Sequence, residues 1–382
     1  MGGAQFSTFY LIQELQKYPK IEIQLLLPRN GQFSRLCEHN LIPFFIYKSQ
    51  PMLSSSISLF QDSIRIPNPF AWINNLIRIL YNSKSIRNIF KHNNNIIILS
   101  KGLYSHFVTT IANRKLSHKL IWHLQDLISS RFGGLLLKLL NFLAKVGPNF
   151  IICDGKSIFD SLNTHNQSKA NVILNGVQTD LFQRTEKLRK YGREEFNIPQ
   201  DAYVIGHVGR FTPWKGQLKL VEAFIDYSNQ NRQAILLLVG APIFDSDFYF
   251  NEIKKRISNY GLKDKIILTG FRSDLDKMFS TMDLFVYPSL EKDTSPLALL
   301  SALSSGIPVA VSSTESLDEI IQKFIGIPIF NPSHKSEIIT AFNQFETEQI
   351  RDEIGQIIYK NFNKHFNMKI HTQYMTDVLY SI

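Results

Sequence analysis

Two short segments of this sequence place cationic and anion-binding groups next to predicted strands. Residues 205–216 read IGHVGRFTPWKG. Gly209 lets the backbone approach a ligand closely, while Arg210 and Lys215 supply two fixed positive charges. Residues 293–295 read Asp-Thr-Ser at a predicted helix start, where backbone N–H groups and the helix dipole favour an anion. Two such loops, each between a strand and a helix, predict a binding site for a nucleotide diphosphate.

Strand-like and helix-like segments alternate along the whole chain, which predicts an α/β fold with parallel sheets covered by helices on both faces. Residues 175–199 separate two sets of strands, and each set is predicted to form a Rossmann-like domain that binds ligands outside the strands' carboxyl ends. From residue 335 onward the pattern is helical. The predicted strands are 21–27, 42–47, 95–100, 120–123, 150–153 and 171–174, followed by 204–208, 235–239, 266–269, 284–287, 309–311 and 327–330.

Composition limits the class of protein. A chain of 382 residues with 44% hydrophobic residues is expected to form two packed domains. No apolar run reaches the roughly 18 residues that span a bilayer, and the first residues do not form a secretory signal. Cys37 and Cys153 have no metal-ligand neighbours, so we expect a reducing, cytoplasmic location and no metal site.

The charge is concentrated in the first half of the sequence. Residues 1–180 hold 19 Lys and Arg against 8 Asp and Glu, whereas residues 181–382 hold 23 against 24. A basic surface attracts phosphates, anionic lipid or nucleic acid, unless it serves only for solvation. Because the sequence shows no zinc spacing, RNA-binding aromatic signature or recognition-helix pattern, nucleic acid is the weaker interpretation, and two remain open: an anionic membrane surface as partner, or a basic face that is only solvated.

The motifs, taken in order, resemble those of the retaining GT-B glycosyltransferases of family four. That family has G-R-x-x-x-x-K-G and then P-S-x-x-E-G-F-G-L-x-x-L-E-A-x-A-x-G-x-P-V. This sequence has Gly209-Arg210 and Lys215-Gly216, then Pro-Ser at 288–289, LLSAL at 299–303 and GIPV at 306–309. The likeness extends to VILNGV at 172–177 and to the Gly-Gly-Ala start, so it covers nearly the whole chain.

The resemblance implies two Rossmann-like domains that face across a cleft. Residues 1–178 would form the acceptor-side domain, residues 179–345 the nucleotide-sugar-binding domain, and residues 346–382 helices that cross back to the first domain. In the family a β-strand precedes the Gly-Gly loop, and here that strand is missing before Gly2. We therefore expect either a start further upstream or a damaged first domain.

The resemblance also implies a donor site in which two cations neutralise the diphosphate without a metal. Asp293 stands where the family has the first of two carboxylates, near the transferred sugar, although an N-cap role would also suit it. Ser301 stands in place of the second, and a hydroxyl cannot accept from both ribose hydroxyls as a carboxylate does. The implied donor-binding residues are Gly2, Gly3, Arg210, Lys215, Gly270, Phe271, Glu291, Thr294, Ser295 and Ser301.

In the first domain the resemblance implies a catalytic His near the end of the strand WHLQD at 122–126. His123 and Asp126 would position the acceptor hydroxyl or stabilise the sugar's developing positive charge. Gln125 stands where other members can carry the His, and His106 is a further candidate. A strand-end His that only makes structural hydrogen bonds is the alternative.

These residues predict a glycosyltransferase that moves a sugar from a nucleotide-sugar donor to a cell-envelope glycan or lipid-linked acceptor with retention. Ser301 and the missing strand motivate an alternative, a non-catalytic binding or partner subunit. An epimerase of the same fold would need carboxylates and a His arranged for proton transfer, and the sequence shows none. Residues 132–146, FGGLLLKLLNFLAKV, could lie on a membrane surface or form a core helix, which the alternating pattern favours.

Overall fold

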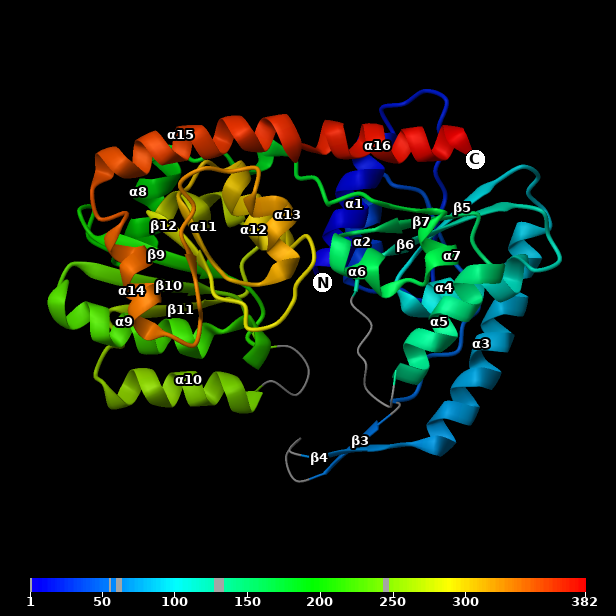
Figure 1. Cartoon of the computed structure of the whole chain (residues 1–382), viewed down its shortest axis with the longest axis horizontal. Helices are drawn as coiled ribbons and strands as arrows, with labels where there is room; N and C mark the ends of the chain where they lie inside the picture. Colours follow the sequence, from blue (N-terminus) through cyan, green and yellow to red (C-terminus); the bar gives the residue numbers. More distant parts are fainter. Residues whose placement is uncertain (1, 55, 60–63, 127–133, 243–246) are drawn as a thin grey trace. The chain divides into compact units, whose positions relative to one another are not determined.

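The computed structural model describes residues 2–54, 56–59, 64–126, 134–242 and 247–382. The chain divides into two compact units, which are described separately (Figure 1). Unit 1 comprises residues 1–174 and 371–382, and unit 2 comprises residues 175–370. This division differs from the predicted domain boundaries after residues 178 and 345, which stay predictions.

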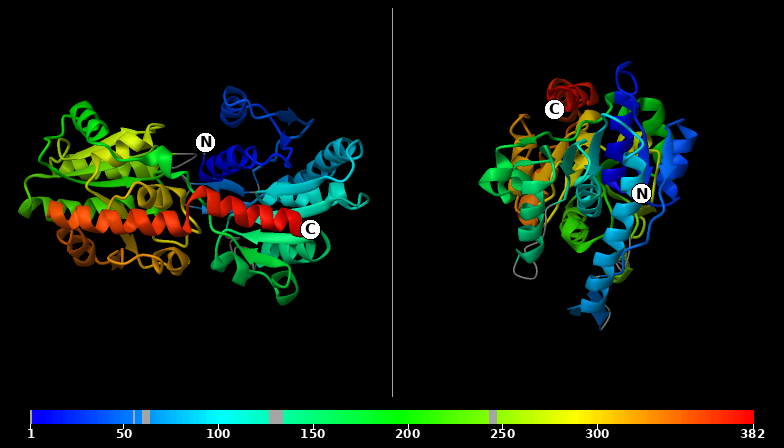
Figure 2. Two further views of the ribbon diagram at one scale, coloured as in Figure 1. Left: turned by 90° about the horizontal axis from the view of Figure 1, so that it is seen from above. Right: turned by 90° about the vertical axis from the view of Figure 1, so that its right-hand side faces the viewer.

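Unit 2 is built on a six-stranded parallel sheet in the order β11-β10-β9-β12-β13-β14. Every residue of β9 and β10 is buried, as expected for strands covered on both faces. Helices lie on both faces of this sheet (Figure 2). The strands are β9 (Tyr203–Val208), β10 (Ala234–Val239), β11 (Ile266–Gly270), β12 (Leu284–Tyr287), β13 (Val309–Ser312) and β14 (Ile329–Phe330).

The helices of unit 2 connect these strands and cover the two faces of the sheet. The core between sheet and helices includes Leu220 and Phe224 of α9 and Phe342 of α14, all fully buried. The helices are α8 (Glu186–Glu195), α9 (Gln217–Gln230), α10 (Asp247–Asn259), α11 (Leu275–Thr281), α12 (Leu297–Ser304), α13 (Asp318–Ile321), α14 (Lys335–Asn343) and α15 (Glu348–His365), with short 3-10 helices η2 (Thr179–Phe182), η3 (Pro213–Lys215) and η4 (Glu315–Leu317).

Unit 1 contains a four-stranded parallel sheet in the order β5-β6-β7-β8, a parallel pair β1-β2 and an antiparallel pair β3-β4. The strands are β1 (Leu25–Leu27), β2 (Phe44–Ile46), β3 (Ser56–Leu59), β4 (Ile64–Pro67), β5 (Ile97–Lys101), β6 (Lys119–Leu124), β7 (Phe150–Cys153) and β8 (Ala170–Val172). The helices are α1 (Gly3–Leu15), α2 (Gln32–His39), α3 (Pro69–Phe90), α4 (Leu103–Asn113), α5 (Leu135–Val146), α6 (Lys156–Ser161) and α7 (Thr164–Gln167).

The end of the chain belongs to the core of unit 1. In α16 (Met368–Ser381), Met375 and Val378 pack in one buried cluster with Leu11 of α1 and with Ile121 and Ile152 of the sheet. The imidazole Nδ1 of His371 bonds the carbonyl of Leu174 at 2.8 Å. Residues 371–382 thus complete the fold of unit 1 from the far end of the sequence.

Two features of the fold were not predicted. Residues 175–199 separate the two sets of strands as expected, but they also contain α8, which packs against α11 within unit 2. Arg193 of α8 is fully buried and donates to Asp283 at 2.7 Å and to the carbonyl of Ala202 at 2.9 Å. The antiparallel pair β3-β4 was not predicted at all.

The predicted α/β fold with two parallel-sheet, Rossmann-like domains is confirmed, and all twelve predicted strands are present, ten of them with shifted ends. None of the helices in the described ranges combines the length and apolar composition needed to cross a bilayer.

Candidate functional site

The loop after β9 in unit 2 is shaped by glycines. Gly209 and Arg210 follow the strand, η3 ends at Lys215, and Gly216, with a φ of +74°, is the N-cap residue just before α9. A Cβ on Gly216 would lie 1.9 Å from the carbonyl oxygen of Pro288, so only glycine lets the loop approach β12 this closely. The carboxamide of Gln217 fixes the loop by donating to the carbonyl of Arg210 at 2.7 Å.

Lys215 is held at the carboxyl edge of the unit 2 sheet. Its ammonium donates to the hydroxyl of Tyr287 at 2.6 Å, forms an ion pair with Asp293, and lies 4.3 Å from the ring centroid of Trp214. Burial lowers the pKa of Lys215, and the charge of Asp293 opposes that shift. The structure therefore joins two residues predicted for this site, with Tyr287 as an unpredicted third member.

Tyr287 and the loop of η4 orient Asp293. Burial and the neighbouring carboxylate raise the pKa of Tyr287 well above its usual value, so its hydroxyl stays protonated. The hydroxyl donates a hydrogen bond to the Asp293 carboxylate. The backbone N–H of Asp293 donates to Ser316 Oγ at 2.9 Å. Arg210 is exposed and lies 5.9 Å from the Trp214 ring centroid, beside the same loop.

The helix after this loop starts later than predicted. α12 begins at Leu297, with Pro296 before it, rather than at residues 293–295. Ser295 has a φ of +47°, and its hydroxyl accepts the backbone N–H of Asn175 at 2.7 Å. Ser295 is thus already bonded to another loop of unit 2, while Thr294 lies buried beside it.

The remaining donor-side predictions are spread over the same unit. Ser301 lies in the middle of α12 and is 5% exposed. Glu291 is exposed in the loop before Asp293. Gly270 ends β11 with a φ of +73°, and Phe271, which follows it, is 62% exposed. The predicted donor-binding roles of these residues stay predictions.

A second polar cluster lies at the carboxyl edge of the unit 1 sheet. His123 is fully buried and its Nε2 bonds the Asp154 carboxylate, which also accepts from Gln125 Nε2 at 3.1 Å. Gln125 Nε2 and Lys101 Nζ both donate to Ser7 Oγ of α1, at 3.1 and 3.3 Å. Lys101, Asp154 and Ser7 were not predicted as site residues.

The charges in this cluster are set by burial. Burial and the charge of Lys101 lower the pKa of His123, so the imidazole is neutral near pH 7. It then carries its proton on Nε2 for Asp154, and its Nδ1 is a buried acceptor with no partner among the described residues. Burial also lowers the pKa of Lys101, to about 8. Burial alone would raise the pKa of Asp154, but His123 and Lys101 hold it below its usual value.

The other predicted residues of unit 1 lie around this cluster or apart from it. Asp126 is exposed two residues after β6. His106 is buried, stacks on Trp122 with ring centroids 5.0 Å apart and bonds Ser100 Oγ at 2.7 Å, so it serves the core. Gly2 and Gly3 form the start of α1, where the Gly2 N–H donates to Gln5 Oε1 at 3.1 Å.

Three of the four site residues that the sequence did not reveal share one signal, whereas the fourth, Ser7, lies within α1. Lys101 and Tyr287 are the last residues of their strands, and Asp154 follows β7 directly. In parallel α/β sheets ligands bind outside the carboxyl ends of the strands. Polar residues at each predicted strand end would therefore have pointed to all three.

The sequence of this chain is similar to those of known glycosyltransferases. Residues 189–361 match the family model of glycosyl transferases group 1. The chain is 30% identical over 147 residues to an Escherichia coli UDP-Gal:alpha-D-GlcNAc-diphosphoundecaprenol alpha-1,3-galactosyltransferase, over 38% of this chain and 37% of that protein. It is 25% identical over 255 residues to the E. coli O-antigen biosynthesis glycosyltransferase WclY, over 64% of this chain and 65% of the relative. The chain thus spans about a third and just under two thirds of these two relatives.

The fold is shared with solved structures. The crystal structure of Anabaena HepE in complex with UDP and glucose superposes with a TM-score of 0.83 at 20% identity, covering 100% of this chain and 96% of that one. At this identity the match shows the fold alone.

Proposed function

We propose, from the match of residues 189–361 to the glycosyl transferases group 1, that this chain moves a sugar from a nucleotide-sugar donor to a glycan or lipid-linked acceptor of the cell envelope. Relatives whose names refer to O-antigen biosynthesis and to a diphosphoundecaprenol acceptor support this acceptor class. A fold shared with a protein solved with UDP-glucose supports a UDP-linked donor.

One observation carries the proposal: Lys215, Tyr287 and Asp293 meet beside the glycine-shaped loop that also presents Arg210. In glycosyl transfer the leaving group is a nucleoside diphosphate, so negative charge develops on its phosphates. Two fixed cations stabilise that charge as it forms and require no metal. The glycines allow the backbone of the loop to approach the phosphates as well.

Asp293 has a distinct role in this proposal. In the structure it pairs with Lys215, so a bound diphosphate would compete with the carboxylate for the Lys215 ammonium. The freed carboxylate would then face the sugar, where it can stabilise the partial positive charge of the transition state. Leaving-group departure assisted on one face of the sugar is consistent with transfer that retains the anomeric configuration.

In unit 1 we assign His123 a positioning role and Asp126 a contact role. His123 is fully buried and engaged with Asp154, so it can fix the end of β6 but offers no exposed atom to a substrate. Asp126, three residues further along, is exposed and carries a carboxylate suited to bonding an acceptor hydroxyl.

The test is a transfer assay with a panel of UDP-, GDP- and dTDP-sugars and short-chain lipid-diphosphate acceptors, with nucleotide release and product configuration as readouts. We expect release with one donor and an axial-to-axial or equatorial-to-equatorial outcome by NMR. Lys215→Ala should abolish release, whereas Lys219→Ala, on the first turn of α9 and paired with Glu222, should not. Release that survives in Lys215→Ala would contradict the assignment of this site.

A further inference from the structure

Helix α5 of unit 1 exposes an apolar stripe instead of burying it. Only Leu140 and Ala144 of its twelve residues are buried. Leu135, Phe142 and Val146 are each more than 60% exposed, and Leu139 is 45% exposed. These four positions are spaced by four, three and four residues, so they lie along one side of the helix. Leu140 and Ala144 belong to the buried core of unit 1, so the expectation that residues 132–146 form a core helix holds for that side of the described part, 134–146, but not for the exposed stripe.

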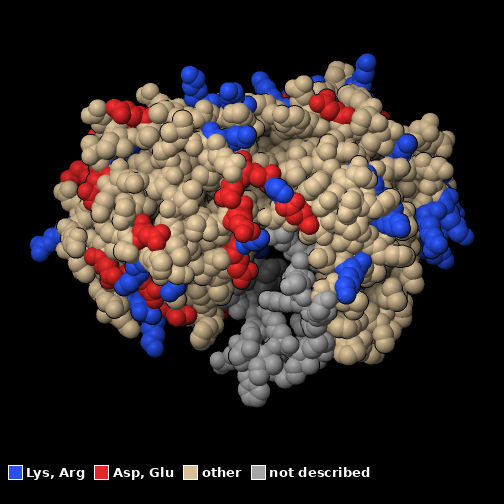
Figure 3. Space-filling view, viewed as in Figure 1, with Lys and Arg blue, Asp and Glu red and all other residues tan. Residues whose placement is uncertain are grey.

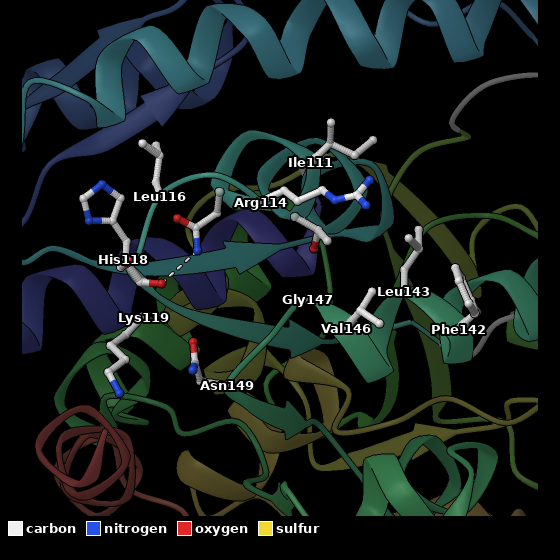
Figure 4. Close-up of a pocket in the computed structure, with 13 residues that line it drawn as sticks. Ile111, Arg114, Leu116, His118, Lys119, Phe142, Leu143, Val146, Gly147 and Asn149 are labelled. Carbon is white, nitrogen blue, oxygen red and sulfur yellow. Dashed lines mark hydrogen bonds between the residues drawn. The ribbon is translucent and has the colours of Figure 1, made fainter.

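Two hollows flank this stripe, and Phe142 lines both. The first lies between α5 and the end of α4, where Arg114 and Lys119 stand with the apolar side chains of Ile111 and Leu143 (Figure 4). The second lies on the other side of α5 and contains Lys138 and Lys145. Neither hollow is lined by an acidic residue. We define the α5 face as this stripe and the cations beside it. It consists of Leu135, Leu139, Phe142 and Val146 together with Arg114, Lys119, Lys138 and Lys145.

The sequence segment that contains α5 is strongly basic, and Asp160, next to Ser161 of the second hollow, is paired with Lys156. From residue 64 to residue 153 the sequence holds 12 Lys and Arg and a single acidic residue, Asp126. In Figure 3, Lys and Arg groups lie on the right-hand side of unit 1 without acidic groups beside them, whereas unit 2 shows both signs. A local field of this kind attracts an anionic surface and repels a basic one.

We propose that the α5 face docks on an anionic lipid bilayer. The apolar stripe would enter the boundary between headgroups and acyl chains. The four cations, two on each side of the stripe, would bind headgroup phosphates. An apolar helix face bordered by Lys and Arg is the pattern of helices that lie in the membrane interface. The proposal does not rest on sugar transfer, since vesicle binding requires no donor.

Charge complementarity favours a bilayer over a second copy of this chain. A second copy would bring the same cations against these, and like charges facing each other across an interface disfavour association. Each Lys or Arg that lies close to an anionic membrane surface raises the binding constant about fivefold. The expected binding is therefore strong on anionic lipid, weak on neutral lipid, and sensitive to salt.

The experiment is co-sedimentation of the full chain with vesicles of phosphatidylglycerol and phosphatidylethanolamine, or of phosphatidylcholine alone. We expect binding to the anionic vesicles only. Phe142→Ser should reduce it about tenfold by removing the central exposed ring. The double variant Lys138→Glu, Lys145→Glu should reduce it at least about twentyfold. Both variants change exposed positions of α5, and a thermal unfolding curve like the parent's would show that the chain remains folded.

Matched controls come from unit 2. Phe248→Ser removes a ring that is 71% exposed on α10, and Lys187→Glu with Lys190→Glu reverses two charges on α8. Both controls should bind vesicles as the parent does. Equal losses in the controls and the α5 variants, or no vesicle binding by the parent, would overturn the proposal. A parent dimer that Phe142→Ser dissociates would instead assign the face to a second copy.

Discussion

The polar cluster of unit 1 predicts a large effect of replacing Asp154 by Asn. Asp154 is 1% exposed, accepts from His123 and Gln125, and balances the charge of Lys101. Asn keeps the shape but removes the charge, which leaves Lys101 as the uncompensated cation of the cluster. Removing one partner of a buried charge pair costs about 3–5 kcal/mol, and the partial exposure of Lys101 places our expectation near the lower end, at about 3 kcal/mol.

The assay is thermal unfolding followed by circular dichroism at pH 7 and pH 9.5. For a unit of this size, about 3 kcal/mol corresponds to a fall in Tm of roughly 6–12 °C. The matched control is Asp160→Asn, whose carboxylate is half exposed and pairs with Lys156 along one helix. Surface pairs four residues apart on a helix contribute about 0.3–0.5 kcal/mol, so the control should melt within about 2 °C of the parent.

The pH dependence separates charge from shape. The pKa of Lys101 is lowered to about 8 in the folded protein, below its value in an unfolded chain. Its burial therefore destabilises the fold below pH 8, and that cost fades as the pH rises from 8 towards 10.5. At pH 9.5 Lys101 is largely neutral in the fold, so the deficit of Asp154→Asn should shrink. An equal deficit at both pH values, or a Tm like the parent's at pH 7, would refute the account of this cluster.

Two further substitutions test the donor-side geometry. Gly216→Ala should lower the Tm by several degrees and weaken UDP binding, because the new Cβ would meet the carbonyl of Pro288 and the residue has a positive φ; a variant that melts and binds like the parent would contradict the close approach of the loop. Ser301→Glu should lower the Tm without nucleotide, since the carboxylate would be buried at a 5% exposed position, but UDP should raise the Tm more than in the parent if the side chain reaches the ribose; an equal rise in both would place the ribose elsewhere.

The sequence predicted strand positions well where an apolar run stands alone between turns. β7 and β12 match their predicted limits, and each is an interior strand that pairs with a neighbour on both sides. β1 was predicted over residues 21–27 yet forms only at Leu25–Leu27, where it pairs with the three residues of β2. Its length is set by its partner, which a local pattern does not encode. The same holds for β3 and β4, whose strand character depends on pairing with each other.

The candidate sites divide in the same way. Arg210 and Lys215 could be predicted because their loop is contiguous in sequence. The partnership of His123 with Asp154 could not, since 31 residues separate them. It arises because β6 lies beside β7 with His123 opposite Ile152, which brings the residues just beyond β7 to the end of β6. Likewise, Lys215 meets Tyr287 through the pairing of β9 with β12, where Leu284 faces Ile205.

The central claim is that Arg210 and Lys215 bind the diphosphate of a nucleotide donor. It is tested most directly by calorimetric titration of UDP and of uridine into the parent, Arg210→Ala and Lys219→Ala. Arg210 is exposed, so its removal leaves the fold intact. We predict that Arg210→Ala weakens UDP binding by about 1.5–3 kcal/mol, the scale of a hydrogen bond to a charged group, and leaves uridine binding unchanged. Lys219→Ala should bind both as the parent does. UDP binding that is equal in the parent and in Arg210→Ala would contradict the claim.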